Sequence, residues 1–109
     1  AVRSVAGKSC KIVMDDGLYL ADPKALAHRV GESKTKHQSL MLIGHNPGLH
    51  MLALALTTPA QTPEFNALQL KFPTAALCVL QTTQSEWKPV TPNSYRLLDF
   101  VLPRELAAA

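Results

Sequence analysis

The stretch SLMLIGHNPGLHMLALALT, at residues 39–57, constrains the fold of this chain more than any other part of the sequence. A short apolar run at 39–44 stops at a Gly-His-Asn-Pro-Gly turn, and a second apolar run follows it. The first run is typical of a strand that is buried on both faces. The second run has helical spacing and predicts a helix that begins near Pro47. Its expected apolar stripe consists of Leu49, Leu52, Ala53 and Leu56. A strand, a tight turn and a helix in succession indicate an α/β fold.

A second helix is predicted before this unit. Asp22 is a favoured N-cap and Pro23 suits the first helical position. Leu26 and Val30 lie four residues apart and therefore share one face of that helix. Gly31 is a plausible C-cap, and the polar segment 32–38 that follows is interpreted as a loop.

The second half of the chain is expected to form antiparallel strands. Two prolines favour a loop at 57–67, and the alternating residues 68–72 are typical of a half-buried strand. Further strand candidates lie at 74–82, 85–90 and 94–102, and the connections between them are short. Short connections suit antiparallel pairing.

The composition indicates one globular domain. The chain has 109 residues, 47% of them hydrophobic, which suits a single small core. The 11 basic residues are scattered among 8 acidic ones, so we expect no nucleic-acid partner. No apolar run is long enough for a membrane span, and no signal peptide is evident, so we expect no membrane partner and a cytoplasmic location. Cys10 and Cys78 are expected to be unpaired thiols.

His45 is the leading candidate for chemistry. In open α/β sheets, ligands bind at the carboxyl ends of strands, where His45 is expected to lie. The next helix directs its N-terminal N–H groups to the same place, which favours an anion such as phosphate. An imidazole that titrates near neutral pH can transfer a proton there. The alternative is a structural or simply solvated histidine.

Four segments in order resemble the histidine phosphatase superfamily, which has the phosphoglycerate-mutase-like fold. They are LMLIGHNPGLHMLALAL, DDGLYLADPKAL before it, KFPTAALCVL after it, and WKPV with YRLLDFVLPREL at the end. The resemblance covers about residues 12–106 and is nearest to the small phosphohistidine phosphatases. It implies a mixed sheet with flanking helices and hydrolysis of phosphohistidine or small phosphomonoesters, without a metal or other cofactor. His45 matches the family's second histidine, and Gly44 and Asn46 match its phosphate-binding neighbours.

The family nucleophile, a histidine in an Arg-His-Gly motif, has no counterpart in residues 1–109. None of His28, His37 or His50 has the required neighbours. Arg3 weakly resembles a later phosphate-binding arginine of the family, and the alternative is that it belongs to a tail. We therefore expect an incomplete domain of this fold, with residues 1–10 as loop or tail and 107–109 as a cloning remnant. Hydrolysis is expected to be weak, because the phosphoenzyme requires that nucleophile.

An incomplete sheet would leave apolar strand edges exposed, and such edges pair with other chains. We therefore expect a homo-oligomer joined through sheet edges. Two other readings remain open. One is a non-catalytic remnant that binds phosphate or serves as an interaction module, and the other is a hydrolase of other esters. His45 and His50 are five residues apart, which does not suit metal ligands on one helical face. Asp15-Asp16 precedes a glycine and is interpreted as a turn.

Overall fold

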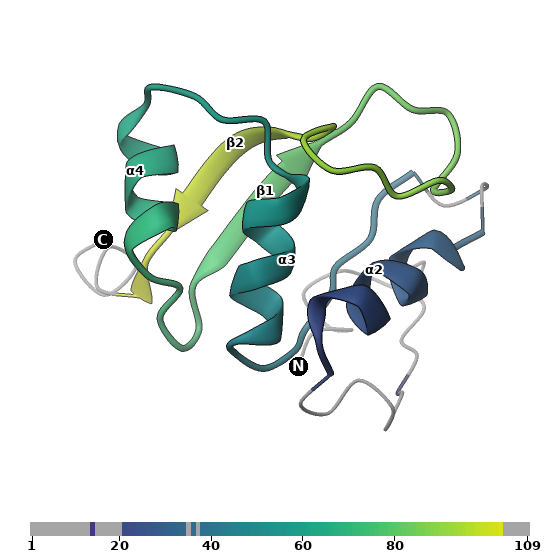
Figure 1. The fold of residues 1–109 in the computed structure, drawn as a ribbon, viewed down its shortest axis with the longest axis horizontal. Helices are drawn as coiled ribbons and strands as arrows, with labels where there is room; N and C mark the ends of the chain where they lie inside the picture. The colour runs from purple at the N-terminus through teal and green to yellow at the C-terminus, as the bar shows by residue number, and fades with distance from the viewer. Residues whose placement is uncertain (1–13, 15–20, 35, 37, 104–109) are drawn as a thin grey trace.

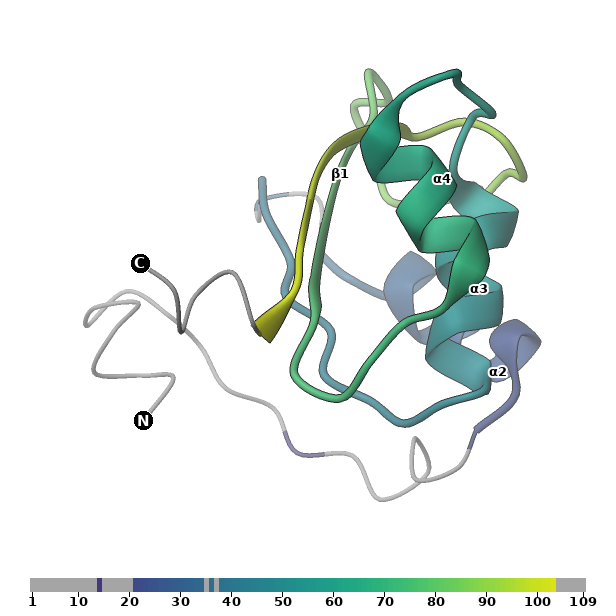
Figure 2. The ribbon, with the colours of Figure 1, turned by 90° about the vertical axis from the view of Figure 1, so that its left-hand side faces the viewer.

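A computed structural model describes residues 14, 21–34, 36 and 38–103 of the chain. These residues form a small α/β fold with three helices and a two-stranded antiparallel sheet. In chain order the elements are α2 (Pro23–Gly31), α3 (Gly48–Leu56), α4 (Pro63–Leu70), β1 (Leu77–Gln81) and β2 (Arg96–Val101). Helix α3 lies between α2 and α4 (Figure 1), and all three helices lie on the same side of the strands (Figure 2). The prediction of an α/β fold is confirmed.

Helix α2 begins as its sequence predicts. The Oδ1 atom of Asp22 accepts a hydrogen bond from the backbone N–H of Ala25 at 2.8 Å, and Pro23 occupies the first turn. Leu26 and Val30 are both buried, as their spacing predicts. The helix runs through Gly31, so the C-cap is the next residue, Glu32.

Helix α4 replaces the predicted loop at 57–67 and the predicted strand at 68–72. Thr62 is its N-cap, and the Thr62 hydroxyl accepts a hydrogen bond from the N–H of Phe65 at 3.1 Å. Phe65 and Leu68 are three residues apart and both buried, whereas Leu70 is 83% exposed. The helical period therefore describes this segment, and the alternation of Leu68, Leu70 and Phe72 is incidental.

The predicted strand at 39–44 is not formed. This segment is described throughout and contains no strand or bridge residue. Leu42 packs against the same core cluster as Leu80 of β1, but Met41 and Ile43 are exposed. A strand needs hydrogen-bonded neighbours, and the two described strands, β1 and β2, pair with each other and not with segment 39–44. The 85–90 strand candidate is likewise absent, so the sheet of the described residues is antiparallel rather than mixed.

The sheet itself lies within the predicted segments 74–82 and 94–102. Cys78 lies opposite Phe100, and Leu80 lies opposite Leu97. The register is irregular between Val79 and Leu80, which leaves one extra residue on β2. Because strand side chains alternate between faces, this bulge allows Leu97 and Phe100, three residues apart, to pack against the same cluster.

Two buried clusters flank α3. One joins α3 to α2 and contains Leu26, Leu52, Leu56 and Tyr95. The other joins α3 to α4 and β2 and contains Ala53, Leu68 and Phe100. The predicted stripe on α3 is therefore largely buried, and it packs on both sides rather than one. This central position fixes the direction in which the N-terminus of α3 points.

Candidate functional site

The turn that carries His45 leads directly into α3. The backbone carbonyl of His45 accepts the N–H of Leu49 at 3.0 Å, and the helix begins at Gly48. The side chain of His45 is exposed. The first turn of α3 contains no acidic residue that would offset the partial positive charge of its N-terminus. His45 thus lies at the positive end of a nine-residue helix, at the end of an extended segment rather than of a paired strand.

Gly48 allows the segment before α2 to approach this turn closely. A Cβ atom on Gly48 would lie 2.1 Å from the backbone carbonyl oxygen of Ala21 and 3.4 Å from Leu26 Cδ1. No side chain fits at that distance from a backbone atom, so the glycine is required for this packing. The start of α3 is thereby held against the segment that enters α2.

Asn46 connects the turn to a distant part of the chain. Its Oδ1 atom accepts the backbone N–H of His50 at 3.2 Å, and its Nδ2 atom donates to the carbonyl of Phe72 at 2.5 Å. The first bond satisfies one of the N–H groups that a helix N-terminus leaves unpaired. The role of Asn46 as a phosphate ligand stays a prediction, and its side chain already joins the turn to the segment after α4.

His50 is part of this connection, although it was not among the predicted site residues. Its ring Nε2 lies 2.5 Å from the carbonyl oxygen of Leu68, at the end of α4. A carbonyl can only accept, so Nε2 carries the proton. The ring also lies near Phe72, with 6.0 Å between centroids, and Phe72 contacts Phe100 edge-on at 5.4 Å. A histidine one helical turn beyond an Asn-Pro turn is the only sequence signal that could have suggested this role.

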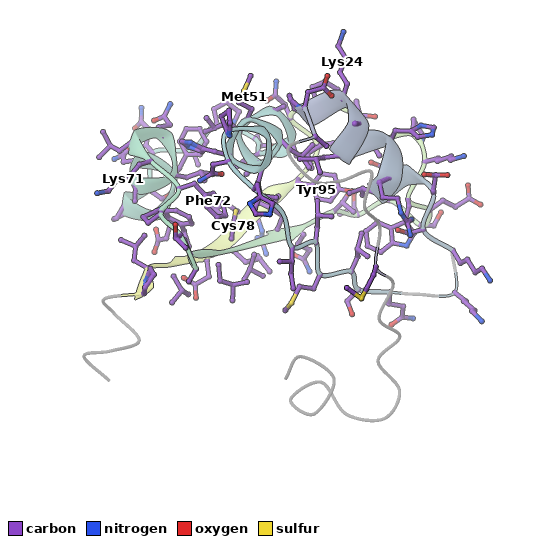
Figure 3. The ribbon with its side chains drawn as sticks, turned by 90° about the horizontal axis from the view of Figure 1, so that it is seen from below. Lys24, Met51, Lys71, Phe72, Cys78 and Tyr95 are labelled. Atoms are coloured by element: carbon purple, nitrogen blue, oxygen red, sulfur yellow. The ribbon has the colours of Figure 1, made fainter. Side chains whose placement is uncertain are left out.

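The other predicted site residues are Gly44 and Arg3. Gly44 is half-buried, and a Cβ atom there would meet only Leu49 Cδ1 at 3.8 Å. Arg3 is outside the described residues, as are 1–10 and 107–109. Lys71 is exposed beside Phe72. Figure 3 shows Lys71 and Lys24 at opposite ends of the row of helices, so these two cations do not converge on one site.

Cys78 packs in the cluster that contains Phe72 and Phe100 and carries a free thiol. Burial raises the pKa of Cys78 to about 11. The thiol is therefore protonated near neutral pH and is a poor nucleophile there. Burial also raises the pKa of Tyr95. Within the part of the chain that the structure describes, no group of three or more His, Cys, Asp or Glu side chains is arranged to hold a metal ion.

Comparison with known proteins finds two related sequences and no assigned activity. The chain is 33% identical over 92 residues to Uncharacterized protein Rv1276c and to Uncharacterized protein MT1313, from two strains of Mycobacterium tuberculosis. The match covers 80% of this chain and 56% of each relative, so the chain spans just over half the length of the curated relatives it matches. No family model matches the chain, and no solved structure matches it significantly. No helix among the described residues has the length and apolar character needed to cross a membrane.

Proposed function

We propose that this chain binds the phosphoryl group of phosphohistidine or of small phosphomonoesters at the N-terminus of α3. The observation that carries the proposal is the exposed imidazole of His45 beside a helix whose first turn contains no acidic residue. The partial positive charge at such a terminus attracts the oxygens of a phosphate. The resemblance of this segment to the second histidine motif of the histidine phosphatases supports the same assignment.

In this proposal His45 acts as the acid or base of a weak hydrolysis. The imidazole donates a proton to the leaving oxygen or accepts one from the attacking water. The partial positive charge at the N-terminus of α3 stabilises part of the charge that develops on the phosphoryl oxygens. Residues 1–109 contain no Arg-His-Gly motif, so this scheme assigns them no covalent phosphohistidine intermediate. Turnover of a generic phosphomonoester is accordingly expected to be slow.

Turnover of a phosphomonoester and binding of inorganic phosphate test the proposal. Both are measured for the wild type, His45→Ala and His28→Ala. His28 is an exposed histidine on α2, 3.9 Å from the Glu32 carboxylate, and serves as the matched control. We expect His45→Ala alone to lose turnover and to weaken phosphate binding. Full activity in His45→Ala, or equal losses in both variants, would contradict a role for His45.

A second candidate function, self-assembly, is favoured by the apolar surface of the extended segment. Met41 is 63% exposed and Ile43 is 68% exposed, and the sheet beside them has only two strands within the described residues. Two-stranded sheets are marginal in water, and apolar extended segments pair readily. We propose that a second copy of the chain covers this surface. Light scattering should then detect a dimer that Ile43→Lys dissociates and Met51→Lys, on exposed α3 surface, does not. A monomer at all concentrations would contradict self-assembly.

A further inference from the structure

Two side chains near the start of α3 reach across to the end of α4 and to the segment that follows it. Asn46 lies in the turn before α3 and His50 in the first turn of the helix, and Asn46 Oδ1 accepts the backbone N–H of His50 at 3.2 Å. Asn46 Nδ2 donates to the carbonyl of Phe72, and His50 Nε2 donates to the carbonyl of Leu68. These bonds join positions 26 and 18 residues apart in the sequence. Together they fasten the His45 turn to the segment 68–76.

The anchor at the other end of this connection is rigid. Leu68 is fully buried, and Phe72 lies between the ring of His50 and the buried ring of Phe100. The segment after Phe72 is itself ordered by a turn in which Ala76 N–H donates to the carbonyl of Pro73 at 3.1 Å. The turn that carries His45 is therefore tied to the core between α3, α4 and β2, although His45 itself is exposed.

We infer that Asn46 and His50 are positioning residues for the proposed phosphoryl site, which they keep in shape by clamping the His45 turn to the segment 68–76. The consequence of this inference rests on the proposed function, since the clamp orients His45 relative to the positively charged N-terminus of α3. Asn46 thus acts through the backbone of the turn. The Nε2–H group of the His50 imidazole is already hydrogen-bonded to the carbonyl of Leu68. Neither residue needs to contact the phosphate.

Hydrogen exchange tests the clamp without any ligand. The amide of Ala76 is 30 positions beyond Asn46, but the clamp predicts that Asn46→Ala speeds its exchange. The expected increase is about tenfold, which corresponds to about 1.4 kcal/mol, the net worth of one or two hydrogen bonds. Asn66→Ala, at an exposed position of α4, is the matched control and should leave this rate unchanged. His50→Gln keeps an N–H donor and should protect Ala76 better than His50→Leu.

Binding of inorganic phosphate, followed by NMR of the His45 ring, tests the consequence for the site. If the wild type binds phosphate, Asn46→Ala and His50→Leu should each weaken binding about tenfold, with partial recovery in His50→Gln. Equal binding by the wild type and Asn46→Ala would overturn the inference and leave the proposed function intact. If the wild type binds no phosphate, the proposed function fails. Hydrogen exchange at Ala76 then tests by itself whether the clamp exists. Unchanged exchange at Ala76 in Asn46→Ala overturns it, and faster exchange supports it.

Discussion

Replacing Gly48 by alanine tests how the start of α3 is packed, because two physical effects oppose each other there. Alanine forms helices better than glycine, by up to about 1 kcal/mol in a helix interior. On propensity alone, Gly48→Ala should stabilise the protein. The structure predicts the opposite, since the new Cβ atom would lie 2.1 Å from the carbonyl oxygen of Ala21.

The size of the clash decides between the two effects. The distance from Cβ to the Ala21 oxygen must grow from 2.1 Å to at least 3.0 Å, and the obstacle is backbone rather than a flexible side chain. Leu26 Cδ1 lies 3.4 Å from the same Cβ position, so a shift in its direction is also restricted. Overpacking of this kind costs about 1–3 kcal/mol, more than the helix propensity returns at a first helical position. We expect a net loss of about 2 kcal/mol.

Urea denaturation followed by circular dichroism measures this loss. For a chain of this size the urea m-value is about 1–2 kcal/mol/M, so the midpoint should fall by about 1–2 M. Gly44→Ala is the matched control, because its Cβ atom would meet only Leu49 Cδ1 at an ordinary 3.8 Å. Its stability should stay within about 0.5 kcal/mol of the wild type. A Gly48→Ala variant at least as stable as the wild type would refute this account of the α2–α3 contact.

Three further predictions concern the core, the thiol and a helix cap. Leu68→Ala should lower the free energy of unfolding by about 3 kcal/mol in the same urea assay, because Leu68 is fully buried. The control Leu70→Ala, at an 83% exposed position, should change it by less than about 0.5 kcal/mol. The pKa of Cys78 is about 11 in the folded protein, whereas the unfolded thiol has a pKa near 9.0. The free energy of unfolding is therefore unaffected by this thiol below pH 9 and falls as the pH rises from 9 toward 11, because only the unfolded state then loses the proton. The loss between about pH 8 and pH 10.5 should be about 2 kcal/mol larger in the wild type than in Cys78→Val, and equal losses would contradict burial of the thiol. Asp22→Ala should cost about 1 kcal/mol through loss of the bond to Ala25 N–H, and Asp22→Asn should recover most of it, as read from thermal unfolding.

Local signals in the sequence mark the helices that begin with a capping residue. Asp22 followed by proline predicted the start of α2, and the same pattern at Thr62-Pro63 starts α4. At this second site the two prolines of 57–67 favoured a loop, and the alternation of Leu68, Leu70 and Phe72 imitated a strand. Only packing separates the two readings, because Leu68 is fully buried and Leu70 is exposed. The segments that form β1 and β2, and their antiparallel pairing, agree with the prediction. The short connections behind it are not all present, because the predicted strand at 85–90 is not formed and 82–95 is one long connection.

Tertiary structure alone decided the state of 39–44 and the surroundings of His45. An apolar run becomes a strand only when another strand supplies hydrogen-bond partners, and the described residues supply none to Met41 or Ile43. The sequence placed His45 in a turn before a helix, and the structure agrees. It could not show that Asn46 and His50 hold this turn to Phe72 and Leu68, because those contacts join residues far apart in the chain. Caps and turns are determined by a few neighbouring residues, whereas contacts between distant residues form only after the helices have packed.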